Sequence, residues 1–143
     1  MGLDMMVYSI GRKKFHKKYT FENYKEEIDV EEKEFRQIIY WRKAYKIFKW
    51  FAQAIPGYVE EDQIFMIDRE TLLSLQDYCL IEKKKIVDSY GESFNEADYY
   101  YISICNLPKD IANYFEYDHT IEKIDDALKE IKNYDVYLFY FIC

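Results

Sequence analysis

Two sets of charged residues have the composition of a binding site, and the first is positively charged. It lies between residues 42 and 50 and consists of Arg42, Lys43, Lys46, Lys49 and Trp50. Lysine and arginine neutralise phosphates, and an aromatic ring stacks on a base, so this combination is typical of single-stranded nucleic-acid or nucleotide binding. A second basic cluster, residues 12–18, could contribute further phosphate contacts or form a solvated loop. The structural alternative for Trp50 is packing beneath a neighbouring segment, with the lysines solvated.

The second set is acidic and flanks the first in sequence. Its members are Glu26, Glu27, Glu31, Glu32, Glu34, Glu60, Glu61 and Asp62. Together with tyrosine anchors, such carboxylates could enter the basic nucleic-acid channel of a partner protein. The formal net charge of -7 and the pI near 4.9 fit an acidic surface that meets a basic partner. The same charge argues against non-specific duplex binding by the whole surface.

Catalytic and cofactor chemistry has little support in this sequence. The only histidines are His16 and His119, and nothing places Cys79, Cys105 or Cys143 beside either of them. The cysteines are odd in number and lack Cys-x-x-Cys spacing, which indicates reduced thiols. With four glycines there is no phosphate-cradling loop, and no metal-site motif occurs. We therefore expect no metal, no cofactor and no enzymatic activity, with a small enzyme of unrecognised type as a third hypothesis.

A single long helix is expected to position the basic set. Apolar residues recur at spacings of 3, 4, 3, 4 and 3 at Ile38, Trp41, Tyr45, Phe48, Ala52 and Ile55. This periodicity predicts an amphipathic helix over residues 31–55, with Asp29 as its N-cap. Pro56 and Gly57 would end it, and the cations would lie on its outer face.

The remaining elements complete one α+β domain over residues 1–143. Apolar runs predict strands at 5–10, 64–67, 99–105 and 136–142, and the last of these lacks alternation, which indicates a central strand covered on both faces. Helical spacing predicts a helix from an N-cap at Asp68 to Gly91, and another over 121–131 capped by Asp118 or Thr120. The expected order is β-α-β-α-β-α-β, with a small mixed sheet and about three packed helices.

The composition also predicts a cytoplasmic protein. No basic region followed by a long apolar run opens the chain, so we expect no signal peptide. No run of 18 apolar residues occurs, so we expect no membrane span. Composition and periodicity predict no particular oligomeric state.

Several short segments resemble a family of small uncharacterised phage and prophage proteins. These segments are Met1-Gly2-Leu3-Asp4-Met5, Tyr40-Trp41-Arg42-Lys43-Ala44, Trp50-Phe51 and Tyr114-Phe115-Glu116-Tyr117-Asp118. The resemblance covers the first half of the chain well and the second half loosely. It implies a phage accessory protein in the host cytoplasm, without implying a mechanism.

The leading hypothesis is therefore a non-enzymatic binding protein that inhibits a host protein, such as a CRISPR-type defence nuclease, through the acidic set. Nucleic-acid or nucleotide binding through the basic set is the alternative.

Overall fold

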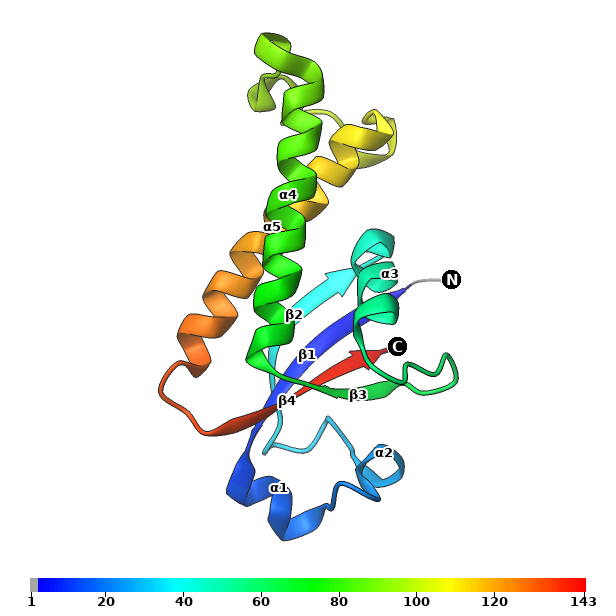
Figure 1. Ribbon diagram of the computed structural model, residues 1–143, viewed down its shortest axis with the longest axis vertical. Coiled ribbons are helices and arrows are strands. Elements are labelled where there is room, and N and C mark those ends of the chain that lie inside the picture. Colours follow the sequence, from blue (N-terminus) through cyan, green and yellow to red (C-terminus); the bar gives the residue numbers. More distant parts are fainter. Residues whose placement is uncertain (1–2) are drawn as a thin grey trace.

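One four-stranded antiparallel sheet organises the chain in the computed structural model, which describes residues 3–143 (Figure 1). Its strands are β1 (Asp4–Gly11), β2 (Arg36–Arg42), β3 (Ile64–Ile67) and β4 (Val136–Ile142), in the spatial order β2-β1-β4-β3. The predicted α+β class is confirmed. The sheet is antiparallel throughout rather than mixed. Met1 and Gly2, the first residues of the phage-like motif, lie outside the described residues.

The central strand β4 is covered on both faces, as its sequence predicts. Leu138 and Tyr140 pack into the core cluster on one face of the sheet, and Phe139 packs into a second cluster on the other face. The neighbouring strand β1 divides in the same way, with Val7 in the first cluster and Ile10 in the second. Because alternate residues of a strand point to opposite faces, only a strand with two covers can be apolar at every position.

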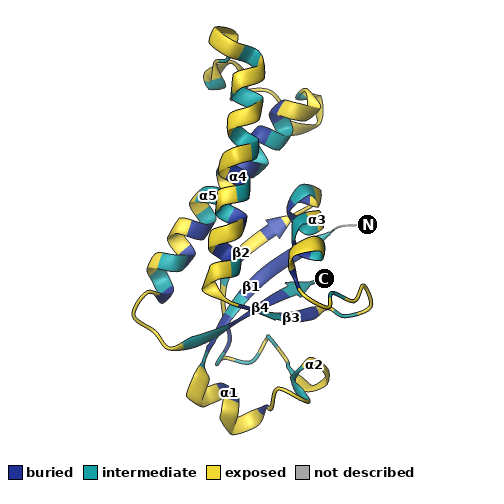
Figure 2. Cartoon of the chain, viewed as in Figure 1, coloured by how far each residue is buried: buried dark blue, intermediate teal, exposed yellow. Residues whose placement is uncertain are grey.

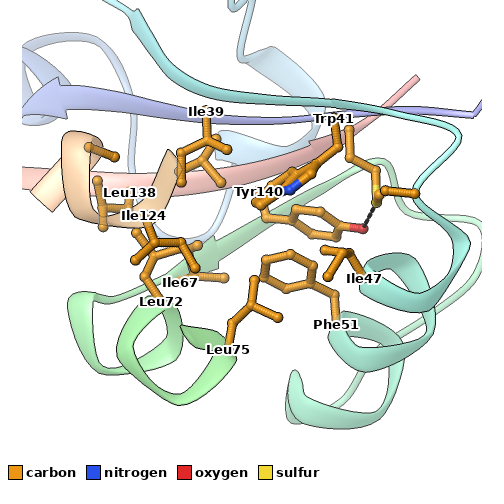
Figure 3. Packing of buried hydrophobic residues seen from close by; sticks show 14 of the residues in the cluster. Ile39, Trp41, Ile47, Phe51, Ile67, Leu72, Leu75, Ile124, Leu138 and Tyr140 are labelled. Carbon is orange, nitrogen blue, oxygen red and sulfur yellow. Dashed lines mark hydrogen bonds between the residues drawn. The ribbon is translucent and has the colours of Figure 1, made fainter. Parts of the chain in front are cut away.

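Three helices cover the first face of the sheet: α3 (Tyr45–Ala54), α4 (Arg69–Tyr90) and α5 (Lys109–Ile131). Figure 3 shows the centre of this core, where the rings of Phe51 and Tyr140 stack with centroids 3.9 Å apart. Leu72 and Leu75 reach this core from α4, and Ile124 reaches it from α5. The second face is covered by α1 (Arg12–Lys18), α2 (Tyr24–Glu27) and the segment between α2 and β2.

Helices α4 and α5 form a hairpin that extends well beyond the sheet (Figure 1). Exposed residues dominate its far end (Figure 2). The connecting segment at that end contains three short 3-10 turns, η1 (Gly91–Ser93), η2 (Glu96–Tyr99) and η3 (Ile104–Asn106). The hairpin therefore has a packed base and a solvent-exposed tip.

The predicted helix over 31–55 is wrong in its first half. Residues 36–42 form strand β2, which pairs with β1, and only 45–54 are helical. In this stretch Ile39 and Trp41 are buried while Tyr40 and Arg42 are exposed, which is the period of a strand. The helical stripe is misleading because the spacing of three between Ile38 and Trp41 fits a helix, whereas the two residues that are buried, Ile39 and Trp41, have the spacing of two that a strand requires. Asp29 consequently caps no helix there.

Three other expectations also need correction. The predicted strand over 99–105 is absent, because this apolar run lies at the tip of the hairpin, away from any strand that could pair with it. The predicted helix over 121–131 begins twelve residues earlier, at Lys109 directly after Pro108, so neither Asp118 nor Thr120 is its cap. The basic cluster at 12–18 is helix α1 instead of a loop.

The local signals around α4 are confirmed in detail. The Asp68 side chain accepts a hydrogen bond from the Thr71 backbone N–H at 2.8 Å, and the Thr71 hydroxyl completes a capping box. Gly91 ends the helix with φ 59°, a conformation that glycine adopts without a side-chain clash. Strand 64–67 is also found at the predicted residues. Within residues 3–143, no helix combines the length and apolar composition that a bilayer span requires.

The core assignment predicts a contrast between two leucines on α4. Leu75 is fully buried, whereas Leu73 is 39% exposed on the outer side of the same helix. We expect Leu75→Ala to lower the free energy of unfolding by about 2–5 kcal/mol, since it removes buried apolar atoms and leaves a cavity. Leu73→Ala should change it by only about 0.5 kcal/mol. Urea denaturation followed by circular dichroism measures both values, and equal losses would contradict this packing.

Candidate functional site

A cleft of about 490 Å³ opens between the start of α3 and the N-terminal part of α5. One wall is formed by residues 41–49, where β2 ends and α3 begins. The other wall is formed by one side of α5 between Lys109 and Lys123, and Ile104 of η3 adds an apolar edge. The cleft therefore joins segments that are about sixty residues apart in sequence.

The cleft is lined by cations from both walls. They are Arg42, Lys43, Lys46, Lys49, Lys109 and Lys123. Across residues 3–143, no Asp or Glu forms an ion pair with any of these six side chains. Among the described residues, Glu116 is the only Asp or Glu that lines the same cleft. A chain with a net negative charge thus collects unpaired positive charge in one hollow.

The wall at residues 41–49 depends on an unusual backbone turn. Lys43 adopts φ 55°, in the left-handed region, and its N–H donates to the Leu3 carbonyl oxygen at 2.6 Å. This conformation costs a residue with a Cβ atom about 1–2 kcal/mol. The turn ends β2 and directs the chain into the first turn of α3, which brings Arg42 and Lys46 to the same cleft.

The opposite wall is held in place by hydrogen bonds between α5 and β2. The buried Trp41 donates from Nε1 to the Thr120 hydroxyl at 3.0 Å, and that hydroxyl donates to the Glu116 carbonyl oxygen at 2.8 Å. Lys123 donates from Nζ to the Tyr40 carbonyl oxygen at 2.7 Å. These contacts fix α5 against the strand from which the other wall emerges.

Glu116 opposes the positive charge of the cleft. Burial raises the pKa of its carboxyl group, while the backbone N–H groups of Ile47 and Lys46 and the charges of Lys46 and Lys123 act in the opposite direction. Its Oε1 is buried and has no hydrogen-bond partner among the described residues. Burial also lowers the pKa of Lys123, an effect that the negative charge of Glu116 opposes. The inner end of the cleft is therefore a partly desolvated carboxylate between two lysines.

The cysteines and histidines considered for catalysis in the sequence are not brought together in this cleft. His119 lines the cleft, but no cysteine or serine lies beside it there. Cys79 is buried elsewhere, and burial raises the pKa of its thiol to about 12, which disfavours a thiolate at neutral pH. Within residues 3–143, no group of three or more histidine, cysteine, aspartate or glutamate side chains is arranged to hold a metal ion.

The basic set that the sequence singles out is largely assembled in this cleft. Arg42, Lys43, Lys46 and Lys49 all line it. Trp50 does not, because its indole packs against Phe51 and Tyr78 with ring centroids 5.3 and 6.4 Å away. The four cations of the set are thus gathered at one site, although not on the face of a long helix. Trp50 instead packs against neighbouring aromatic side chains.

The acidic set is dispersed over the opposite side of the sheet. Glu31, Glu61 and Asp62 border a hollow whose floor includes Tyr8 and Phe141. The remaining members lie apart from it. Glu26 and Glu27 are on α2, Glu60 is exposed between α3 and β3, and Glu32 and Glu34 lie beside the lysines of α1. Glu32 pairs with Lys18, and Asp62 pairs with Lys25. The eight carboxylates therefore form no single unpaired surface.

The contribution of α5 to the cleft is what the sequence analysis misses. Lys109, Asn113, Glu116, Thr120 and Lys123 follow one another at spacings of 4, 3, 4 and 3. This is a polar stripe with helical periodicity, and it would have been visible if the last helix had been extended back to Pro108. The sequence does not show that this stripe lies opposite residues 42–49, because periodicity does not reveal which helix faces which turn.

Comparisons with protein-family models, with curated proteins and with solved structures find no match to this chain. The resemblance to small phage proteins therefore stays a prediction.

The raised pKa of Glu116 predicts a pH-dependent stability difference. A raised carboxyl pKa means that the folded protein binds this proton more tightly than the unfolded chain, whose value is near 4.5. The resulting stabilisation is complete below that value and is lost as the pH rises through the raised pKa. We expect Glu116→Gln, which keeps the size of the side chain without its charge, to melt at a higher temperature than the unsubstituted protein at pH 7. The two should converge near pH 4.

The control for this experiment is Glu122→Gln, an exposed position on the same helix. It should leave the melting temperature unchanged at both pH values. A lower melting temperature for Glu116→Gln at pH 7 would mean that the carboxylate stabilises the fold, contrary to the balance described above.

Proposed function

We propose that this protein is a non-enzymatic binding module that holds a phosphate-bearing ligand, of the nucleotide or nucleic-acid class, in the basic cleft. The observation that carries this proposal is the convergence of six unpaired cations from two walls on one hollow of about 490 Å³. That volume lies within the range of small-molecule and cofactor sites.

The chemistry of the lining supports a phosphate ligand over a neutral one. Arginine offers a planar fork of donors to phosphate oxygens, and lysines supply mobile point charges. Lys109 and Lys49 approach from opposite walls, so a bound anion would be contacted from both sides. Glu116 at the inner end opposes deep entry of negative charge, which favours contacts with the outer cations Arg42, Lys43, Lys49 and Lys109.

A second candidate function uses the acidic hollow on the other side of the sheet. Glu31, Glu61 and Asp62 border it above an aromatic floor, a composition that favours a lysine- or arginine-rich partner. In this function the protein is a phage-type inhibitor that occupies the basic channel of a host defence nuclease. The ion pairs of Asp62 and Glu32 weaken this candidate relative to the cleft, because they already neutralise part of the acidic set.

Reversing charge on both walls of the cleft should weaken ligand binding. The variant Lys49→Glu with Lys109→Glu is expected to weaken binding of a labelled single-stranded oligonucleotide of about 12 nucleotides by more than about tenfold. Fluorescence anisotropy measures the affinity. The matched control, Lys129→Glu with Lys132→Glu, makes the same charge change at exposed positions at the far end of α5. An equal loss of affinity in both variants would mean that only the net charge of the protein matters, and it would refute the site.

The salt dependence gives a second, independent measure of the same contacts. If the four outer cations neutralise phosphates of a single strand, the plot of log affinity against log salt concentration should have a slope of about -3. Replacing Lys49 and Lys109 by glutamine should bring the slope closer to zero by about 1.4. A flat salt response of the unsubstituted protein would exclude phosphate recognition in the cleft.

The acidic candidate is tested by its own charge reversal. The variant Glu31→Lys with Glu61→Lys should lose affinity for a labelled arginine-rich peptide, and Glu122→Lys with Asp126→Lys, on the outer side of α5, should not. Absence of peptide binding at moderate salt would remove this candidate.

A further inference from the structure

The tip of the α4–α5 hairpin presents aromatic and aliphatic side chains to solvent. Tyr101 is 99% exposed and Ile104 is 72% exposed, and Tyr100 and Ile102 beside them are also exposed. Large apolar side chains scattered singly on a surface need no explanation, but a contiguous group of them indicates an interaction site. None of the packing described above uses these four residues.

The backbone that carries these side chains is held by local hydrogen bonds. The N–H of Ile102 donates to the Tyr99 carbonyl oxygen at 3.2 Å, and the N–H of Asn106 donates to that of Ser103 at 2.8 Å. Nearby, the ring of Phe94 packs edge-on against Tyr114 of α5 with centroids 4.9 Å apart. The outward-facing rings are therefore presented on a supported turn.

The tip is continuous with the basic cleft. Ile104 belongs to the tip segment and also lines the cleft, and Lys109, two residues beyond Leu107, lines it from the start of α5. Figure 1 shows the connecting segment near the start of α5 on the same side of the hairpin as α3. A ligand that leaves the cleft along the N-terminal end of α5 would thus reach the exposed rings.

We infer that the ligand of the cleft is single-stranded nucleic acid, whose phosphates lie among the cations and whose bases stack on Tyr100 and Tyr101 at the tip. This inference rests on the proposed function. Tyr100 and Tyr101 are not part of the cleft wall, so a ligand that contacts both regions must extend beyond the cleft, as a mononucleotide does not. A ring without surrounding walls offers an open face, and an open face is all that base stacking requires.

The combination also distinguishes a single strand from a duplex. In a duplex the bases are stacked on one another and their faces are not available to a protein ring, whereas in a single strand they are. Cations along a groove with aromatic rings at its end are the arrangement by which proteins bind single strands with little sequence preference. The ligand class expected here is accordingly a flexible strand that is longer than the cleft.

The test compares two probes and two pairs of substitutions. The probes are a labelled single-stranded oligonucleotide of about 12 nucleotides and inorganic tripolyphosphate, which carries the charge but no base. Tyr100→Ala with Tyr101→Ala should weaken oligonucleotide binding by about tenfold or more and leave tripolyphosphate binding unchanged. It should also leave the salt slope unchanged, because it removes no cation. Tyr100→Phe with Tyr101→Phe keeps both rings and should retain the affinity.

The control is Tyr134→Ala, a tyrosine of 62% exposure beyond the opposite end of α5. It should bind both probes as the unsubstituted protein does. If the Tyr100 and Tyr101 alanine variant binds the oligonucleotide normally while Lys49→Glu with Lys109→Glu does not, the stacking inference fails and the cleft function stands. If neither variant changes the binding of either probe, the cleft function itself fails.

Two other outcomes would also overturn the inference. Equal affinity for a duplex of the same length would mean that base faces are not read. A shift from dimer to monomer in sedimentation when both tyrosines are replaced by alanine would assign the tip to contacts between copies of this chain. Unchanged circular dichroism establishes that each variant is folded before its binding is interpreted.

Discussion

The arrangement of the sheet, α3 and α5 depends on the contacts of the buried Trp41 side chain. Its indole packs edge-on against Phe51 of α3, with ring centroids 5.8 Å apart, and its N–H donates to Thr120 of α5. One residue of β2 therefore joins the sheet to the two helices whose surfaces form the cleft. Because a buried indole N–H without a partner is costly, the position of Thr120, and with it the register of α5 on the sheet, is strongly constrained.

That constraint explains how an acidic protein assembles a basic hollow. Five lysines outside the cleft form ion pairs with carboxylates, among them Lys83 with Asp118 and Lys25 with Asp62. In the cleft, the turn at Lys43 and the polar stripe of α5 bring like charges together without such partners. Like charges that converge and are not neutralised disfavour a compact fold. Glu116 compensates only in part, since burial disfavours its charged form.

The base and the tip of the α4–α5 hairpin have different roles in the structure. Near the sheet, α4 and α5 bury Leu72, Leu75 and Ile124 and stabilise the domain. Beyond the sheet, most of the residues of the two helices are exposed and lie outside the core. The segment from Tyr99 to Cys105 illustrates the consequence, because its β-favouring residues have no strand within reach and form exposed turns instead. The β-propensity of this segment has no effect there, because no strand edge is available for it to pair with.

Local chemistry is enough to predict several elements from the amino-acid sequence. The capping box at Asp68, the end of α4 at Gly91, strand 64–67 and the central position of 136–142 depend on residues within a few positions of one another. The four cations between Arg42 and Lys49 are likewise recognisable as a group. The tertiary structure alone decides that 36–42 is a strand, since its pairing with β1 overrides an equally good helical pattern. It alone also brings Lys109 and Lys123 opposite those cations and leaves Trp50 in the packing, because such contacts depend on the mutual orientation of elements, which no short-range pattern encodes.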